Sequence, residues 1–301
     1  MSISLVSIII PYYKKKDTIN RSVDSVINQT HTNWELIIVD DNGIEPLEIN
    51  LQWENYNISY LYNEKNLGAA KTRQRGQDIA KGDYIAFLDA DDWWDSLFLE
   101  KCVHRLEIEK DCDGVYVKSL VCFADGASAL RRYNNLSLSR IRETIIQYAR
   151  PWQTSAIVWR KTSCGNWGDL KTNEDAWYEI SSSKFNTLIP IDYVGNFFDR
   201  TNEFTLSTYY GLKYSIISQQ ELFIFIFKNY FTHVNIKYKV ILVNRLIRGQ
   251  LKIFEYCPEQ SRIMGNKIFT LSSILFWMRN SPGLLKLIHK ILQKTIFKIN
   301  F

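Results

Sequence analysis

The hydrophobic pattern at the start of the chain predicts buried strands that alternate with an amphipathic helix. Residues 5–10 and 34–39 are almost continuously apolar and rich in β-branched side chains, as expected of strands covered on both faces. Between them, residues 17–29 place Ile and Val at helical spacing behind Asp17, a candidate N-cap. We expect Pro11 to end the first strand. Strand, helix and strand in this order predict a right-handed βαβ unit.

The alternation continues and predicts one α/β domain followed by a helical region. Further strands are expected at 59–62, 84–88, 114–121 and 155–159, and further helices at 68–81 and 175–184. Beyond residue 210 the pattern becomes helical. We therefore predict a mixed sheet flanked by helices over residues 1–210 and an amphipathic helical region over residues 211–301.

Charge divides the chain in the same place. The net charge is +5, but residues 211–301 hold 14 Lys and Arg against 3 Asp and Glu, leaving 23 against 29 in residues 1–210. In residues 284–294 the lysines interleave with Leu and Ile, a pattern typical of a helix on an anionic membrane surface rather than on nucleic acid. An ordinary amphipathic helix packed on its own domain remains an equal alternative.

Apolar runs, the order of charges and the cysteines indicate the cell compartment in which the protein is expected. No apolar run approaches the roughly 18–20 residues that a membrane-spanning helix needs. Lysines 14–16 follow the first apolar run, whereas a secretory signal has its positive charges in front. The five cysteines are odd in number and scattered, so we expect reduced, mostly buried thiols. These features predict a cytoplasmic protein, peripheral at the inner face of the cell membrane.

Three carboxylates, Asp89, Asp91 and Asp92, follow directly after the predicted strand at 84–88. Ligands of open α/β sheets bind at the carboxyl ends of the strands, where this cluster is expected. Crowded carboxylates repel one another, and Mg²⁺ or Mn²⁺ relieves the repulsion while keeping positions open for phosphate oxygens. An Asp-x-Asp is also common in surface turns, so this motif alone does not establish a metal site.

Five ordered segments place the acid cluster in a wider context. They are VSIIIPYY from Val6, SVINQT from Ser25, WELIIVDDNG from Trp34, NLGAAKTR from Asn66 and GDYIAFLDADD from Gly82. Together they closely resemble the large inverting glycosyltransferase family 2. The resemblance covers roughly residues 4–210 and implies the Rossmann-like, nucleotide-sugar-binding GT-A fold.

The resemblance also implies roles for individual residues at the nucleotide. Pro11 and Tyr13 look like the first loop that contacts the nucleotide. Asp41 resembles the carboxylate that accepts a hydrogen bond from the base, and Arg73 resembles a cation that faces the nucleotide. Asp89 is then expected near the ribose.

The resemblance to the family also implies which residues contact the metal ion and the phosphates. Asp91 is expected to bind Mn²⁺ or Mg²⁺, with Asp92 as its neighbour or second ligand. Lys14 stands where the family usually has Asn, which leaves the contacts of that loop open, although its ammonium could face phosphate. Arg200, in the segment FDRTNEFTLS, is expected to pair with the diphosphate; a surface salt bridge is the alternative.

The candidate catalytic base comes from a later motif. Glu174 and Asp175 resemble the family's Glu-Asp pair at the start of a helix, and Asp175 is expected to take the proton from the attacking hydroxyl. Capping of that helix is the simpler alternative. Several tryptophans could stack on a sugar ring, although buried packing explains any single one better: Trp93, Trp94, Trp152 and Trp167.

The predicted function is metal-dependent, inverting transfer of a sugar from a nucleotide diphosphate donor, UDP-linked, to a hydroxyl of a glycan. The basic region suggests a lipid-linked acceptor and a role in surface polysaccharide, lipopolysaccharide, O-antigen or capsule assembly. Two alternatives stay open. A noncatalytic nucleotide-sugar-binding subunit would keep the fold, and a sugar-phosphate nucleotidylyltransferase would need a glycine-rich loop that the residues after Pro11 do not supply.

Overall fold

The computed structural model describes most of the chain as two compact units. The described residues are 3–43, 47, 51–131, 140–148, 150–170, 172–182, 184–200 and 206–256. One unit comprises residues 1–141, 150–169 and 177–203, and the other comprises residues 142–149, 170–176 and 204–301. The predicted boundary between two domains at residue 210 stays a prediction.

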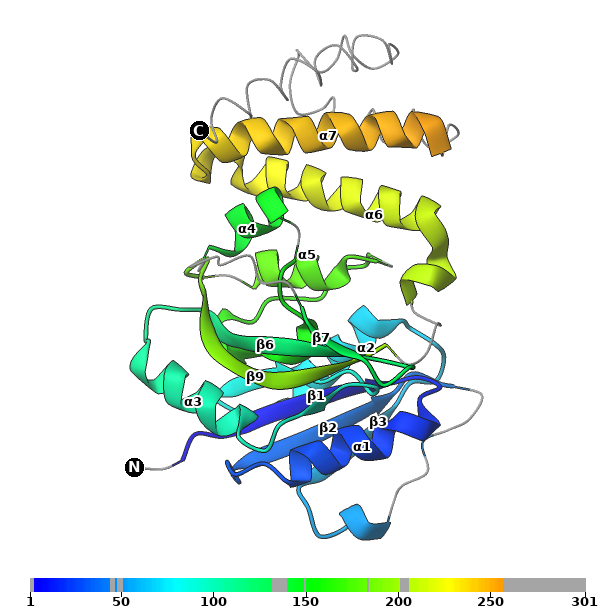
Figure 1. Ribbon diagram of the computed structural model, residues 1–301, viewed down its shortest axis with the longest axis vertical. Helices are drawn as coiled ribbons and strands as arrows, with labels where there is room; N and C mark the ends of the chain where they lie inside the picture. The colour runs from blue at the N-terminus through cyan, green and yellow to red at the C-terminus, as the bar shows by residue number, and fades with distance from the viewer. Residues whose placement is uncertain are drawn as a thin grey trace. The chain divides into compact units, whose positions relative to one another are not determined.

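A nine-stranded mixed sheet runs through the described part of the first unit (Figure 1). Its strands are β1 Val6–Tyr12, β2 Trp34–Asp40, β3 Ile58–Tyr62, β4 Tyr84–Phe87, β5 Trp93–Trp94, β6 Gly114–Phe123, β7 Ser128–Leu130, β8 Ile157–Arg160 and β9 Leu188–Arg200. They lie in the order β3-β2-β1-β4-β8-β6-β9-β5, and β7 pairs with β6. The neighbours from β3 to β4 are parallel, whereas β8 is antiparallel to both of its neighbours. The predicted mixed α/β sheet is confirmed.

Burial explains why the first strands could be predicted from the sequence. All of β2 and the first five residues of β1 are buried, because β1 has a neighbour on each side and helices on both faces. Pro11 does not end the strand as expected; β1 continues to Tyr12. Pairing of β1 with β4 stops at Ile9, so Pro11 pairs with Val39 of β2 alone, and its missing N–H is tolerated at the open side.

Helices cover both faces of this sheet (Figure 1). The first unit contains α1 Lys16–Ile27, α2 Ala69–Ile79 and α3 Phe98–Ile108, and α5 Glu174–Ser181 carries residues of both units. Helices α1 and α3 share a buried core with the side chains of Ile8 and Ile10. On the other face, α2 approaches closely: a Cβ on Gly76 would stand 2.5 Å from Ile9. The N-cap of α1 is Lys15, so Asp17 lies in the first turn rather than at the cap as predicted.

The second unit is helical in its described part. It includes most of α4 Ile141–Tyr148, then α6 Leu206–Tyr230, a 3₁₀ turn at Phe231–His233 and α7 Ile236–Tyr256. Gln220 of α6 donates a hydrogen bond to the carbonyl of Leu246 in α7, at 2.8 Å, and Gly249 leaves room for this amide. The predicted helical character beyond residue 210 is confirmed as far as residue 256, and the amphipathic segment 284–294 lies outside the described residues. Among the described helices, none combines the length and the apolar character needed to cross a membrane.

Candidate active site

The predicted acid cluster lies on a short loop, residues 88–92, which we call the acid loop. It leaves the carboxyl end of β4 beside the ends of β1 and β2. The N–H of Leu88 donates to the carbonyl of Ile9, at 3.0 Å, and the N–H of Asp92 donates to the carbonyl of Asp89, also at 3.0 Å. The loop therefore turns immediately after the strand and places its side chains at the sheet edge where open α/β proteins bind ligands.

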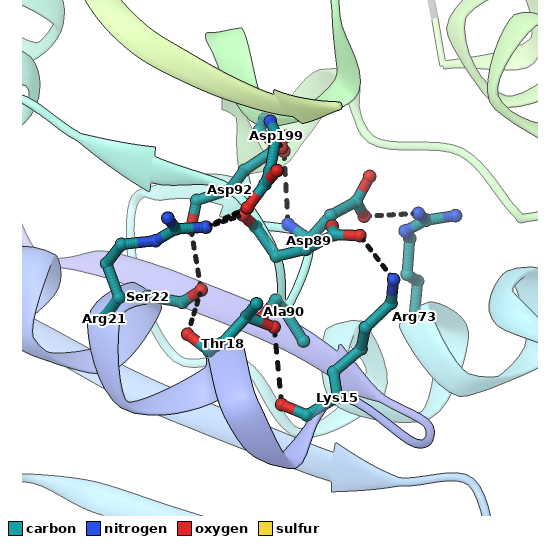
Figure 2. A network of polar contacts seen from close by, with 11 residues as sticks. Lys15, Thr18, Arg21, Ser22, Arg73, Asp89, Ala90, Asp92 and Asp199 are labelled. Carbon is teal, nitrogen blue, oxygen red and sulfur yellow. Dashed lines mark hydrogen bonds and ion pairs between the residues drawn. The ribbon is translucent and has the colours of Figure 1, made fainter. Parts of the chain in front are cut away.

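Helix α1 holds the backbone of the acid loop through three side chains, which we call the α1 clamp (Figure 2). Thr18, Arg21 and Ser22 donate hydrogen bonds to the carbonyl oxygens of residues 90, 91 and 92, at 2.8, 2.8 and 2.7 Å. Spacing of three and four residues puts these donors on one face of the helix. Three successive carbonyls are thereby satisfied by a rigid element, which fixes the conformation of the loop.

Arg21 also connects the clamp to the far strand β9. Its guanidinium pairs with the buried carboxylate of Asp199 and lies 3.8 Å from the ring centroid of Trp93. The Trp93 ring stacks on Phe197 with 5.3 Å between centroids and 5° between planes. Trp93 is therefore engaged within the fold, and packing explains it better than stacking on a sugar.

Asp92 points into the protein. Its Oδ2 accepts a hydrogen bond from the Ser155 hydroxyl at 2.6 Å, and its Oδ1 accepts one from the N–H of Asp199 at 3.1 Å. The same hydroxyl accepts a bond from the N–H of Asp89, at 3.1 Å. Burial raises the pKa of Asp92 well above its usual value, and the negative charges of Asp89 and Asp91 raise it further. Asp92 as a second metal ligand stays a prediction, and its observed contacts join the acid loop to β8 and β9.

Asp89 and Asp91 are the carboxylates that reach solvent, with 31% and 27% of their side chains exposed. Each has a cation beside it: Arg73 lies 2.6 Å from Asp89 (Figure 2), and Lys15 lies 2.7 Å from Asp91. Burial, and then the charge of Asp89, raises the pKa of Asp91, while Lys15 opposes the rise. Part of the repulsion in the cluster is thus neutralised by the chain's own cations.

The fit of a divalent ion can be judged from these two carboxylates. Within the described ranges, no three His, Cys, Asp or Glu side chains are placed together to hold a metal ion. Mg²⁺ in phosphate-handling sites is usually bound by one or two carboxylates, with the remaining positions filled by water and substrate phosphates. The part-exposed pair Asp89 and Asp91 fits that requirement, provided that a phosphate ligand completes the coordination.

Asp41, the predicted contact for the base, is 3% exposed and organises the neighbouring loop. Its Oδ1 accepts hydrogen bonds from the Asn63 side chain and the Leu67 N–H, both at 2.7 Å, and its Oδ2 accepts one from the Gly68 N–H at 2.9 Å. Gly68, with φ +84°, is the N-cap of α2, the helix that carries Arg73. Asp41 therefore positions the start of α2, and its contact with a base stays a prediction.

Other predicted nucleotide contacts lie at the ends of strands. Pro11 is part-buried near the end of β1, and Tyr13, which follows, is 37% exposed. The ammonium of the exposed Lys14 lies 5.1 Å from the centroid of the Tyr13 ring. Arg200, the last residue of β9, is exposed and packs its guanidinium 4.9 Å from the ring centroid of Phe198. Their roles toward a nucleotide stay predictions.

The candidate base lies in the first turn of α5 and belongs to the second unit. Asp175 is half-buried, and its Oδ1 accepts a hydrogen bond from the N–H of Ala176 at 2.7 Å. Its role in catalysis stays a prediction. The three remaining candidate sugar platforms are buried aromatic packing residues: Trp94, Trp152 and Trp167.

Several residues of the site were missed by sequence reasoning: Lys15, Thr18, Arg21, Ser22, Ser155 and Asp199. Lys15 was noted only as one of three consecutive positive charges. The polar spacing of Thr18, Arg21 and Ser22 on α1 was the available signal, but it equally describes a solvated helix face.

The α1 clamp leads to a stability prediction. Ser22→Ala removes a buried donor and leaves the carbonyl of residue 92 without it, so we expect the free energy of unfolding to fall by about 1–2 kcal/mol. Ser25→Ala is the matched control: its hydroxyl bonds the carbonyl of Ser22 within the same helix, and its loss should cost less than about 0.5 kcal/mol. Urea denaturation of both variants tests this, and equal losses would contradict a clamping role.

A sheet with a parallel first half and a mixed second half, bearing an acid loop at the carboxyl edge of β4, is the arrangement of the GT-A glycosyltransferases. The crystal structure of S. aureus TarS 1-349 shares this fold, with a TM-score of 0.67 and 16% sequence identity over 97% of this chain and 89% of that chain. The sequence model of glycosyl transferase family 2 matches residues 7–163, and the chain belongs to this family.

Curated relatives resemble part of the chain. The Escherichia coli UDP-Glc:alpha-D-GlcNAc-diphosphoundecaprenol beta-1,3-glucosyltransferase WfaP is 42% identical over 107 residues, which cover 35% of this chain and 43% of WfaP. WfgD, an E. coli glucosyltransferase named for the same activity, is 43% identical over 91 residues, covering 30% of this chain and 36% of WfgD. The matched segments thus span less than half of these relatives.

Proposed function

We propose that this chain transfers a sugar, with inversion, from a UDP-linked donor to a hydroxyl of a glycan acceptor. Membership of glycosyl transferase family 2 supports the class of reaction. S. aureus TarS 1-349 has been crystallised in complex with UDP-GlcNAc, and WfaP is named for a UDP-Glc donor. The donor assigned to this chain follows from those two proteins.

One observation carries the proposal: two part-exposed carboxylates, Asp89 and Asp91, stand on a loop whose backbone is fixed by α1. A charged site built on a fixed backbone needs little reorganisation when charge develops in the reaction. When bound, a Mn²⁺ or Mg²⁺ ion held by Asp91, with Asp89 or Asp92 beside it, supplies the positive charge that stabilises the departing diphosphate.

The chain's own residues have separate tasks in this proposal. Arg73 and Arg200 supply positive charge toward the donor, and Asp41 with Tyr13 orients the nucleotide. Asp175 takes the proton of the acceptor hydroxyl as its oxygen bonds to the anomeric carbon. The bond between that carbon and the diphosphate oxygen breaks on the opposite side, so the configuration inverts and the nucleoside diphosphate leaves with the bonding electron pair.

The acceptor and its location follow from the relatives and from charge. WfaP and WfgD are named for a diphosphoundecaprenol acceptor, which is a membrane lipid carrier. We propose a lipid-linked glycan acceptor, a role in cell-surface polysaccharide synthesis, and contact of residues 211–301 with the inner face of the membrane. Sedimentation of the full chain with phosphatidylglycerol vesicles, abolished by high salt, is the expected result. No sedimentation at low salt would remove the membrane contact from the proposal.

Release of nucleoside diphosphate from a panel of nucleotide sugars tests the reaction. We expect one donor to be turned over in the presence of Mn²⁺ or Mg²⁺, loss of release in EDTA, and release lowered roughly a hundredfold by Asp91→Asn. Asp95→Asn is a matched control, because Asp95 is a nearby carboxylate that accepts bonds from the Leu97 N–H and the Tyr193 hydroxyl.

The same assay separates the alternatives. Pyrophosphate formation from a sugar phosphate and a nucleoside triphosphate would indicate a nucleotidylyltransferase. Binding of a nucleotide sugar without release under any metal or acceptor condition would indicate a noncatalytic subunit. Absence of both binding and release for every donor would sink the proposed function.

A further inference from the structure

Lys15 forms an ion pair with Asp91, and this pair has no task in the proposed transfer of a sugar. The Lys15 ammonium lies 2.7 Å from Oδ2 of Asp91, and the two side chains are only 25% and 27% exposed. Lys15 is also the N-cap residue of α1, and its carbonyl accepts the N–H groups of Thr18 and Ile19, at 3.2 and 3.0 Å. Its backbone is therefore fixed, and its side chain projects from a fixed point onto the acid loop.

Asp91 is itself held at a fixed place. Arg21 of the α1 clamp binds the Asp91 carbonyl at 2.8 Å, and Thr18 binds the carbonyl before it. Both partners of the ion pair thus depend on the first two turns of α1, so the pair forms with little loss of side-chain freedom. Such an ion pair is stronger than one between two mobile surface side chains.

A divalent ion that binds Asp91 competes with the Lys15 ammonium. Both cations seek the same carboxylate, and two positive charges a few ångströms apart repel each other strongly in a part-buried site. Asp89 does not relieve this competition for Asp91, because its own Oδ1 already pairs with the guanidinium of Arg73 at 2.6 Å. We therefore expect the ammonium to move away from Asp91 when a metal ion binds this carboxylate.

We infer that Lys15 is a built-in competitor of the divalent cation at Asp91, which lowers the metal affinity of the chain. This inference rests on the metal site of the proposed function. It makes Lys15 a positioning residue: the ammonium holds the carboxylate in place, and the cation has to displace it. Removal of the ammonium should then increase metal affinity, whereas removal of a typical site residue would decrease it.

Direct binding of Mn²⁺ to the full-length chain, without nucleotide, tests this. The concentration of free Mn²⁺ can be measured by electron paramagnetic resonance, and this measurement does not require the chain to turn over a substrate. We expect Lys15→Gln to bind Mn²⁺ about tenfold more tightly than the wild type and Lys15→Arg, which keeps the charge, to resemble the wild type. Lys14→Gln is the matched control, since it removes the same charge from the adjacent exposed residue, and it should change the affinity less than about twofold.

A double-mutant cycle locates the effect. In an Asp91→Asn background, Lys15→Gln should give no gain in Mn²⁺ affinity, because the shared carboxylate has been removed. Equal affinities of Lys15→Gln and Lys14→Gln, in chains with wild-type circular dichroism, would overturn this inference and leave the metal site standing. No Mn²⁺ binding by any of the chains, Lys15→Gln included, would overturn the inference together with the metal-dependent part of the proposed function.

Discussion

Asp175→Asn is expected to lower kcat roughly a thousandfold while the donor KM stays within about threefold of the wild type. The asparagine side chain keeps the shape and can still accept the hydrogen bond from the Ala176 N–H, so the start of α5 should be preserved. It cannot take a proton from the acceptor hydroxyl. Steady-state kinetics with the donor and an acceptor, together with donor binding by calorimetry, measure both quantities.

Glu174→Gln serves as the control for Asp175. It removes the adjacent carboxylate from the same first turn of α5 and should lower kcat less than about tenfold. If both variants lose activity equally, or if Asp175→Asn keeps a wild-type kcat, the base lies elsewhere. A loss of donor binding in Asp175→Asn would instead place this carboxylate at the donor.

Trp167→Ala is expected to lower the free energy of unfolding by about 3–5 kcal/mol and to raise the donor KM severalfold. The Trp167 ring stacks on Tyr178 with centroids 4.3 Å apart and meets the edge of Phe87 at 4.9 Å. Its face lies 4.8 Å from the guanidinium of Arg73, which pairs with Asp89. Truncation therefore opens a cavity and removes the support that holds Arg73 against the acid loop.

Two variants separate these effects. Trp152 is fully buried against Tyr116, whereas the aromatic contact to Arg73 is made by Trp167, so Trp152→Ala should cost a similar amount of stability without changing the donor KM. Trp167→Phe keeps an aromatic face and should retain most of both properties. Chemical denaturation and donor kinetics measure the two effects, and a donor KM raised equally by Trp152→Ala and Trp167→Ala would contradict the supporting role of Trp167.

The strands β1 and β2 were predictable because consecutive residues in them are buried, whereas β5, β7 and β9 were not predicted. Ile8, Ile9 and Ile10 are all fully buried, so both faces of β1 demand apolar side chains and the run is unbroken. Helix boundaries were less predictable. Lys15 caps α1 through its backbone alone, which leaves no N-cap signature in the sequence, and Pro11 is accommodated because β4 ends early.

The acid cluster was predictable from its motif, whereas the elements that hold it were not. The α1 clamp joins side chains to main-chain carbonyls about 70 residues away. Because every residue has the same carbonyl, these bonds leave no signal in the sequence of the acid loop. At the end of β9 the motif drew attention to Arg200, whose role stays a prediction, and gave no signal for the neighbouring Asp199, which contacts Arg21 and Asp92. Successive side chains of a strand point to opposite faces, so a match in sequence does not decide which of two neighbours enters the site.

The α1 clamp separates the shape of the acid loop from its chemistry. Thr18, Arg21 and Ser22 bind main-chain oxygens that every amino acid possesses, so we expect the loop to keep its path when the side chains at 89 and 91 are replaced. The side chains at these two positions therefore determine which ligand the loop binds, while α1 determines the path of its backbone. A designer who wished to install histidine or cysteine ligands for a softer metal could begin there without rebuilding the backbone.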